Sequence, residues 1–286
     1  MALFYKNTNI KISKEIQKLY AILIIKGTNA ADFNMWLTWY EKFIKCDKII
    51  ILNDNSELNI SDYIKNYNNI VLINELYSKT NQIDNYNIVI SDIIKPNIND
   101  IIIIPDFDEF WWYDSFKFNS FKECVMHDFI KFKTHSLGVP WTNMMSKNLL
   151  ATRPENMNYN DLCKFRINVA FIEMKPVILY DNNDFDSVHH GLKNFETITT
   201  TDVFEIDNRH KMFARTIYDY YLRLYHYRIT TIDEYNDKIK TSLIKQNLIN
   251  NKRYYMDSNI EDYLTKSKQF PYMLDLTVDS TLKYLK

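Results

Sequence analysis

Short apolar runs that alternate with helical patterns are the feature of this sequence that most limits its fold. The runs are continuous, which is typical of strands buried on both faces of a parallel sheet. Apolar residues at helical spacing separate them, so the pattern predicts an α/β fold with a mostly parallel central sheet flanked by helices. The predicted strands are Tyr20–Lys26, Lys48–Asn53, Ile70–Asn74 and residues 100–105, and the predicted helices are one that Asp32 caps, Ser61–Tyr67 and Asn81–Ile94.

The second half of the chain has a less regular pattern. Phe129–Trp141 and Asn168–Tyr180 are typical of strands, whereas Arg209–Arg228 carries apolar residues at helical intervals. Thr231 and Glu234 have the spacing of a capping box, which predicts the start of another helix.

The chain shows no linker rich in Gly, Pro or Ser. The sequence therefore predicts a single domain. Residues 1–193 are expected to form its core, and residues 194–286 a helical C-terminal portion of the same domain.

Composition excludes several kinds of binding site. The net charge is −1 and the charges are scattered, which argues against a nucleic-acid-binding surface. The three glycines, Gly27, Gly138 and Gly191, are far apart, so a P-loop and a dinucleotide-binding glycine turn are both absent. A nucleotide bound by this chain would need another partner for its phosphates, and a metal ion is the expected substitute.

Cysteine usage and apolar runs predict a cytoplasmic protein without a membrane span. The three cysteines lack C-x-x-C spacing, which fits a reducing compartment. The longest apolar runs are too short to cross a bilayer, and the first residues contain no long apolar segment.

Three carboxylates follow the last predicted strand of the first half. Residues 101–112 read IIIIPDFDEFWW, so Asp106, Asp108 and Glu109 come directly after an apolar run, as Asp54 does after an earlier one. Ligands of open parallel sheets bind beyond the carboxyl ends of the strands, so we expect these side chains at one edge. Two carboxylates at i and i+2 suit Mg²⁺ or Mn²⁺, which prefer oxygen ligands and bridge carboxylates to phosphates.

Several segments together resemble glycosyltransferases of the GT-A fold, closest to the family 92 and family 2-like group. The chain matches their order of motifs from Tyr20 to Ile239, although Lys26-Gly27-Thr28 replaces the usual Lys-Asn-Glu. The matching segments are residues 23–56, the NQIDNYN segment at 81–87, the Asp-x-Asp-Glu-Phe metal motif at 106–110 and LYHYRITTIDEYNDKI at 224–239.

The resemblance implies a metal-dependent transfer of a sugar from a nucleotide-diphosphate donor, with UDP-sugars favoured, to a glycan or protein acceptor. It implies that Asp106 and Asp108 bind Mn²⁺ or Mg²⁺ with a histidine, His226 first and His189 or His190 second. His226 is equally compatible with a packed core residue. The remaining implied roles are catalysis for Asp108 and Glu109, with Glu109 either a base or structural, and donor binding for Lys26, Asp54, Gln82, Asp106 and Arg228.

Tryptophans near the acidic motif are candidates for an acceptor site. Trp111, Trp112 and Trp141 could stack on the apolar face of a sugar ring, or they could pack in the core.

Two alternatives to a glycosyltransferase remain: a haloacid-dehalogenase-like phosphatase, with Asp106 as nucleophile and Asp108 as general acid, and a non-catalytic carbohydrate-binding protein.

Overall fold

The structure is a computed structural model of the 286-residue chain. The part of the chain that it describes comprises residues 17–79, 81–167, 174–187, 191–192, 198–199, 203–207, 211–214, 221–237, 272–274 and 277–285.

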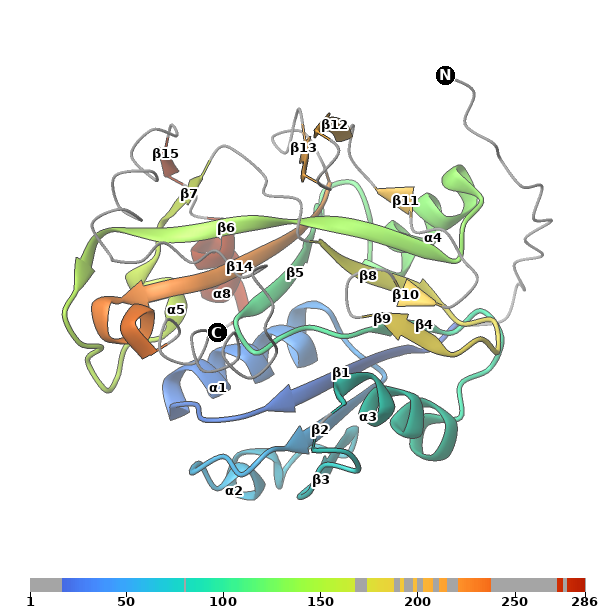
Figure 1. The fold of residues 1–286 in the computed structure, drawn as a ribbon, viewed down its shortest axis with the longest axis horizontal. Helices are drawn as coiled ribbons and strands as arrows, with labels where there is room; N and C mark the ends of the chain where they lie inside the picture. Colours follow the sequence, from blue (N-terminus) through green and yellow to red (C-terminus); the bar gives the residue numbers. More distant parts are fainter. Residues whose placement is uncertain are drawn as a thin grey trace.

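The first half of the chain forms the parallel part of a large sheet (Figure 1). Its strands lie in the order β3-β2-β1-β4, and β1 pairs in parallel with both β2 and β4. All four strands therefore point their carboxyl ends toward the same edge, as the apolar runs predict. The strands are β1 (Leu19–Ile25), β2 (Lys48–Asn53), β3 (Ile70–Ile73) and β4 (Ile101–Ile103).

The second half extends this sheet with mostly antiparallel strands. β8 (Met174–Leu179) pairs antiparallel with both β4 and β6 (Ser136–Leu150). β14 (Leu222–Thr231) runs parallel to β6 and antiparallel to β5 (Glu109–Tyr113), and Figure 1 shows β14 beside β6. The α/β fold class is confirmed, and the chain returns late in its sequence to the strand that follows the acidic motif.

Smaller elements complete the described structure. Residues 232–237 are also helical. The remaining strands are β7 (Phe165–Ile167), β9 (Phe185–Ser187), β10 (Gly191–Leu192), β11 (Ile198–Thr199), β12 (Val203–Asp207), β13 (Lys211–Ala214) and β15 (Tyr272–Leu274), and the remaining helices are α5 (Tyr159–Leu162) and α8 (Thr277–Leu285).

The helices of the first half lie where the sequence predicts them, with one changed cap. Asn29, not Asp32, caps α1: its side-chain oxygen accepts a hydrogen bond from the Asp32 backbone N–H at 2.8 Å. Asp32 instead sits inside the first turn, where a carboxylate suits the helix dipole. The helices are α1 (Ala30–Thr38) with η1 (Trp39–Phe43), α2 (Ile60–Ile64), α3 (Gln82–Ile88) with η2 (Val89–Ile94), and α4 (Phe121–Phe132).

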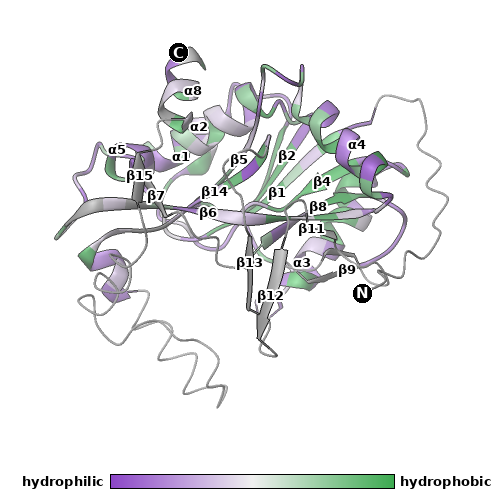
Figure 2. Ribbon diagram, turned by 90° about the horizontal axis from the view of Figure 1, so that it is seen from above, coloured by the Kyte–Doolittle hydropathy of each residue, from purple (hydrophilic) through white to green (hydrophobic). Residues whose placement is uncertain are grey.

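Alternate residues of β1 face two separate cores. Leu19, Ala21 and Leu23 pack with α1, η1 and β5, whereas Tyr20 and Ile22 pack with α3 and η2. This division follows from the two-residue period of a strand that has helices on both sides. Figure 2 shows how strongly apolar the central strands are.

One prediction for the second half holds in part and another is wrong. In the stretch Phe129–Trp141, residues 136–141 belong to β6 as predicted, whereas residues 129–132 form the end of α4. The predicted helix Arg209–Arg228 contains the strands β13 and β14 among its described residues. Both stretches are rich in aromatic residues, which suit a strand buried between neighbours, and short apolar runs do not distinguish such a strand from a helix.

Candidate active site

The acidic motif lies on the segment that leaves the carboxyl end of β4 and enters β5. Three backbone contacts hold it there. The Asp106 N–H donates to Glu109 Oε2 at 2.8 Å, and the Glu109 N–H donates to the Asp106 carbonyl at 3.1 Å. The Tyr227 N–H of β14 donates to the Asp108 carbonyl at 2.9 Å. We call residues 106–108 the Asp-x-Asp loop.

Phe107 anchors the loop between its two aspartates. Its ring stacks on Phe33 of α1, with centroids 6.4 Å apart, and meets the edge of Tyr159 of α5 at 6.1 Å. Tyr159 in turn lies under Arg153, whose guanidinium carbon is 4.6 Å from the ring centroid. The apolar middle residue therefore points inward while its acidic neighbours take part in polar contacts.

Glu109 and Lys175 form a buried pair below the loop. Glu109 is 0% exposed and Lys175 is 1% exposed. Lys175 Nζ lies 2.8 Å from Asp106 Oδ2 and 3.7 Å from Glu109 Oε2. Burial raises the pKa of Glu109 well above its usual range, and the Asp106 carboxylate adds to the increase. Burial acts to lower the pKa of Lys175, but Glu109 and Asp106 outweigh it, so that pKa is raised.

His226 faces Asp108, with His226 Nε2 3.5 Å from Asp108 Oδ2. The other ring nitrogen, Nδ1, lies 3.1 Å from Asn143 Oδ1 on β6. An amide oxygen can only accept, so this contact places the proton on Nδ1. In the neutral ring, Nε2 then presents a lone pair toward a carboxylate oxygen, an arrangement that a cation between the two groups would stabilise.

The chemistry of these donors therefore fits a divalent cation at Asp108 and His226. Within the described residues, however, no group of three or more His, Cys, Asp or Glu side chains is arranged to hold a metal ion. Asp106, the third predicted ligand, has its Oδ2 atom engaged by Lys175. A full ligand set stays a prediction.

The three tryptophans have different surroundings. Trp111 is 0% exposed and packs on Phe121, so it belongs to the core rather than to a surface that a sugar could reach. Trp141 packs against His226, with ring centroids 4.1 Å apart. Trp112 is half-buried, and Arg223 lies over its ring at 5.0 Å. Trp141 is also buried, at 7% exposed, so burial favours the core-packing alternative for both Trp111 and Trp141, and Trp112 is the candidate that stays partly exposed.

Predicted donor-binding residues lie at the same edge of the sheet. Lys26 and Asp54, which follow β1 and β2, form an ion pair at 3.1 Å. Gln82 begins α3 and donates from Nε2 to the Tyr86 hydroxyl at 2.6 Å. Burial raises the pKa of Tyr86 well above its usual value, and the nearby Asp106 carboxylate adds to this increase. The effect of Asp106 on Tyr86 shows that α3 lies near the Asp-x-Asp loop.

The structure does not describe the side chains of three predicted site residues. Arg228 lies in β14, but only its backbone is described. His189 and His190 lie outside the described residues.

Sequence reasoning missed Lys175 and Asn143. A single lysine inside the apolar run MKPVIL was a usable signal, because an ammonium group is seldom buried without a carboxylate partner. Asn143 gave no such signal, since its role depends on β14 pairing with β6.

A second polar cluster joins α1 to the end of β14. Arg153 bonds Asp32 through Nη1 and lies 2.6 Å from Glu234 Oε1 through Nη2. Burial raises the pKa of Asp32 to about 6, against the opposing effect of Arg153. The predicted capping box is present in part: the Glu234 N–H donates to Thr231 Oγ1 at 3.3 Å, but the Glu234 carboxylate accepts from the Thr230 N–H.

The fold and site thus define a mixed α/β protein with a carboxylate-rich edge. In the described part of the chain, every helix is too short or too polar to cross a lipid bilayer. No protein-family profile matches the sequence, and no protein with a curated description matches it.

Solved structures match about half of the chain. One is S. aureus TarS 1–349 in complex with UDP-GlcNAc, at 10% identity over 48% of this chain and 37% of that chain, with a TM-score of 0.32. Another is 4-diphosphocytidyl-2C-methyl-D-erythritol synthase from Anaerococcus prevotii DSM 20548, at 14% identity over 49% of this chain and 61% of that chain, with a TM-score of 0.30. The chain spans less than two thirds of either protein.

Proposed function

We propose that this chain is a metal-dependent glycosyltransferase of the GT-A type. It moves a sugar from a nucleotide-diphosphate donor, a UDP-sugar in the first instance, to a glycan or protein acceptor. The observation that carries the proposal is the 3.5 Å approach of His226 Nε2 to Asp108 Oδ2. The motif resemblance assigns these two residues to one metal ion, and their closeness supports that assignment.

The metal would be Mn²⁺ or Mg²⁺, held by Asp108 and His226 together with Asp106. Such an ion stabilises the negative charge that develops on a departing diphosphate. The side chain of Asp106 is 41% exposed, so a ligand at the edge of the sheet can reach its carboxylate. Because the chain has no glycine-rich phosphate cradle, the proposal assigns charge neutralisation to this ion, with Arg228 as a further partner of the diphosphate.

The chain's own residues orient the reacting groups. Asn143 fixes the proton of His226 on Nδ1 and leaves Nε2 free to bind, a type of outer contact that strengthens histidine ligands. Glu109 is fully buried and bonds the Asp106 N–H, so it acts as a positioning residue for the loop rather than as a base that touches substrate.

Donor and acceptor would approach from the carboxyl edge of the sheet. Lys26, Asp54 and Gln82 provide polar groups there for the nucleotide. Trp112, which is half-buried beside β14, supplies an aromatic ring on which the acceptor sugar could stack.

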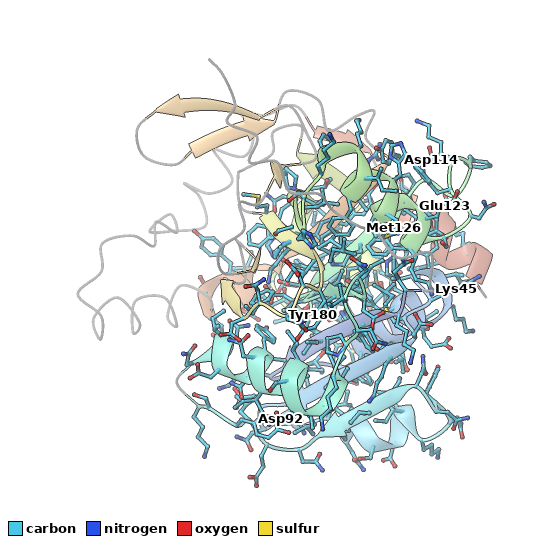
Figure 3. All side chains as sticks on the ribbon, turned by 90° about the vertical axis from the view of Figure 1, so that its right-hand side faces the viewer. Lys45, Asp92, Asp114, Glu123, Met126 and Tyr180 are labelled. Atoms are coloured by element: carbon cyan, nitrogen blue, oxygen red, sulfur yellow. The ribbon has the colours of Figure 1, made fainter. Side chains whose placement is uncertain are left out.

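The test is consumption of a panel of nucleotide-sugars by the purified protein with Mn²⁺ or with EDTA. Asp108→Ala should abolish metal-dependent consumption. Asp92→Ala is a matched control, because Asp92 is an exposed aspartate on η2, where Figure 3 labels it. The control should retain the wild-type rate.

Three outcomes separate the proposed classes of protein. Sugar transfer that requires Mn²⁺ and Asp108 supports the proposal. Release of phosphate from small phosphoesters without sugar transfer would point to the phosphatase. Binding of a sugar without any turnover would point to a carbohydrate-binding protein.

A further inference from the structure

Lys175 is the most deeply buried cation of the described site. Its side chain leaves β8, which is paired with β4 on one side and β6 on the other, with Val139 of β6 as its register partner. Its ammonium group reaches Asp106 Oδ2 at 2.8 Å from the interior. The strand fixes the starting point of the side chain, and only 1% of the Lys175 side chain is exposed.

The carboxylates around Lys175 repel one another in the metal-free protein, and the positive charge of Lys175 offsets this repulsion. Asp106, Asp108 and Glu109 lie within four consecutive positions, and Glu109 is completely buried. Glu109 Oε1 has no hydrogen-bond partner, while Oε2 accepts from the Asp106 N–H at 2.8 Å and lies 3.7 Å from the Lys175 ammonium group, so these two groups together stabilise the buried carboxylate. A divalent cation that binds Asp106 must share this carboxylate with a positive charge already present.

We infer that Lys175 is a fixed counter-ion of the Asp-x-Asp loop. Its ammonium group holds Asp106 in place without metal and competes with a divalent cation for the Asp106 carboxylate. The inference rests on the proposed metal site and adds a residue that sets its affinity. Lys175 leaves Oδ1 of Asp106 for a metal and engages Oδ2, so Asp108 and His226 carry most of the binding.

The test measures binding of Mn²⁺ alone, by calorimetric titration and by the electron paramagnetic resonance signal of free Mn²⁺. Glu109→Gln serves as the background, because glutamine keeps an acceptor for the Asp106 N–H and removes a buried charge. In this background, Lys175→Met should tighten Mn²⁺ binding by about tenfold or more, since a cation next to the ligand is lost. Lys175→Arg should keep the affinity of the background.

A second comparison leaves Lys175 unchanged and so does not depend on the folding of its variants. If Lys175 already engages Asp106, Asp106→Asn should weaken Mn²⁺ binding by a smaller factor than Asp108→Asn does. Equal or weaker binding after Lys175→Met, or a larger loss from Asp106→Asn than from Asp108→Asn, would overturn the inference. Absence of Mn²⁺ binding in all variants would overturn it too.

These measurements report Mn²⁺ affinity and do not depend on sugar transfer. A failed comparison between variants that still bind Mn²⁺ therefore removes the counter-ion role of Lys175 and leaves the transferase proposal to its own test, whereas absence of Mn²⁺ binding in the wild type would count against both. Conversely, a protein that binds Mn²⁺ as expected but consumes no nucleotide-sugar would retain the role of Lys175 and lose the proposed reaction.

Discussion

The imidazole of His226 and the carboxylate of Asp108 lie 3.5 Å apart although they come from opposite halves of the chain. β14 brings them together by running between β5, which follows Asp108, and β6, which carries Asn143. The strand pairing also explains why Asn143 can reach the far side of the His226 ring. One strand thus completes a polar site that the first half of the chain begins.

Asp108→Ala should separate metal binding from folding. Removing one of several crowded carboxylates relieves repulsion, and the Asp108 carbonyl keeps its bond to the Tyr227 N–H. We expect the melting temperature without metal to stay within about 2 °C of wild type. The stabilisation by UDP with Mn²⁺ should disappear, as EDTA should also remove it from the wild type. A large loss of stability without metal would show that Asp108 is structural.

Asn143→Leu should weaken Mn²⁺ binding by about 10- to 100-fold, because the Nδ1 proton of His226 loses its acceptor. Thr142→Val is the matched control on the same strand. The Thr142 hydroxyl is buried without a hydrogen-bond partner, so its removal should leave Mn²⁺ affinity unchanged. Titration with Mn²⁺ measures both. Similar losses in the two variants would indicate damage to β6 rather than a role for Asn143.

Asp32→Asn should change the pH dependence of stability. The pKa of Asp32 is raised by burial to about 6 from an ordinary 3.8, so its contribution is fully present below about pH 4 and is lost as the pH rises through 6. Between these limits, the stability of wild type relative to Asp32→Asn should fall by on the order of 2–3 kcal/mol. Urea unfolding across this range measures the difference, and parallel profiles would contradict the raised pKa.

Phe107→Ala should loosen the Asp-x-Asp loop. Phe107 is half-buried against Phe33 and Tyr159, so the free energy of unfolding should decrease by about 1–3 kcal/mol, less than for a fully buried phenylalanine. Mn²⁺ affinity should also fall, because Asp106 and Asp108 flank the lost anchor. Phe116→Ala provides the control, since that ring is fully exposed and its loss should change neither quantity.

The sequence predicts the parallel half of the fold well because its signals are local. Each apolar run is continuous and is bounded by polar turns, and parallel strands that share helices on both faces must end at one edge. The local pattern alone is therefore enough to place Asp106 and Asp108 after β4, and Lys26 and Asp54 after β1 and β2. The same pattern misassigns the cap of α1, where Asn29 and Asp32 both have suitable side chains.

The tertiary structure alone decides the rest, because strand pairing in the second half joins residues that are distant in sequence. The aromatic stretch around His226 is compatible with a helix until its pairing with β5 and β6 is known. The same pairing buries Trp111 and gives His226 its Asn143 partner, while β8 carries Lys175 under the Asp-x-Asp loop. The sequence determined which carboxylates stand at the edge of the sheet, and the long-range packing brings His226, Asn143 and Lys175 to them.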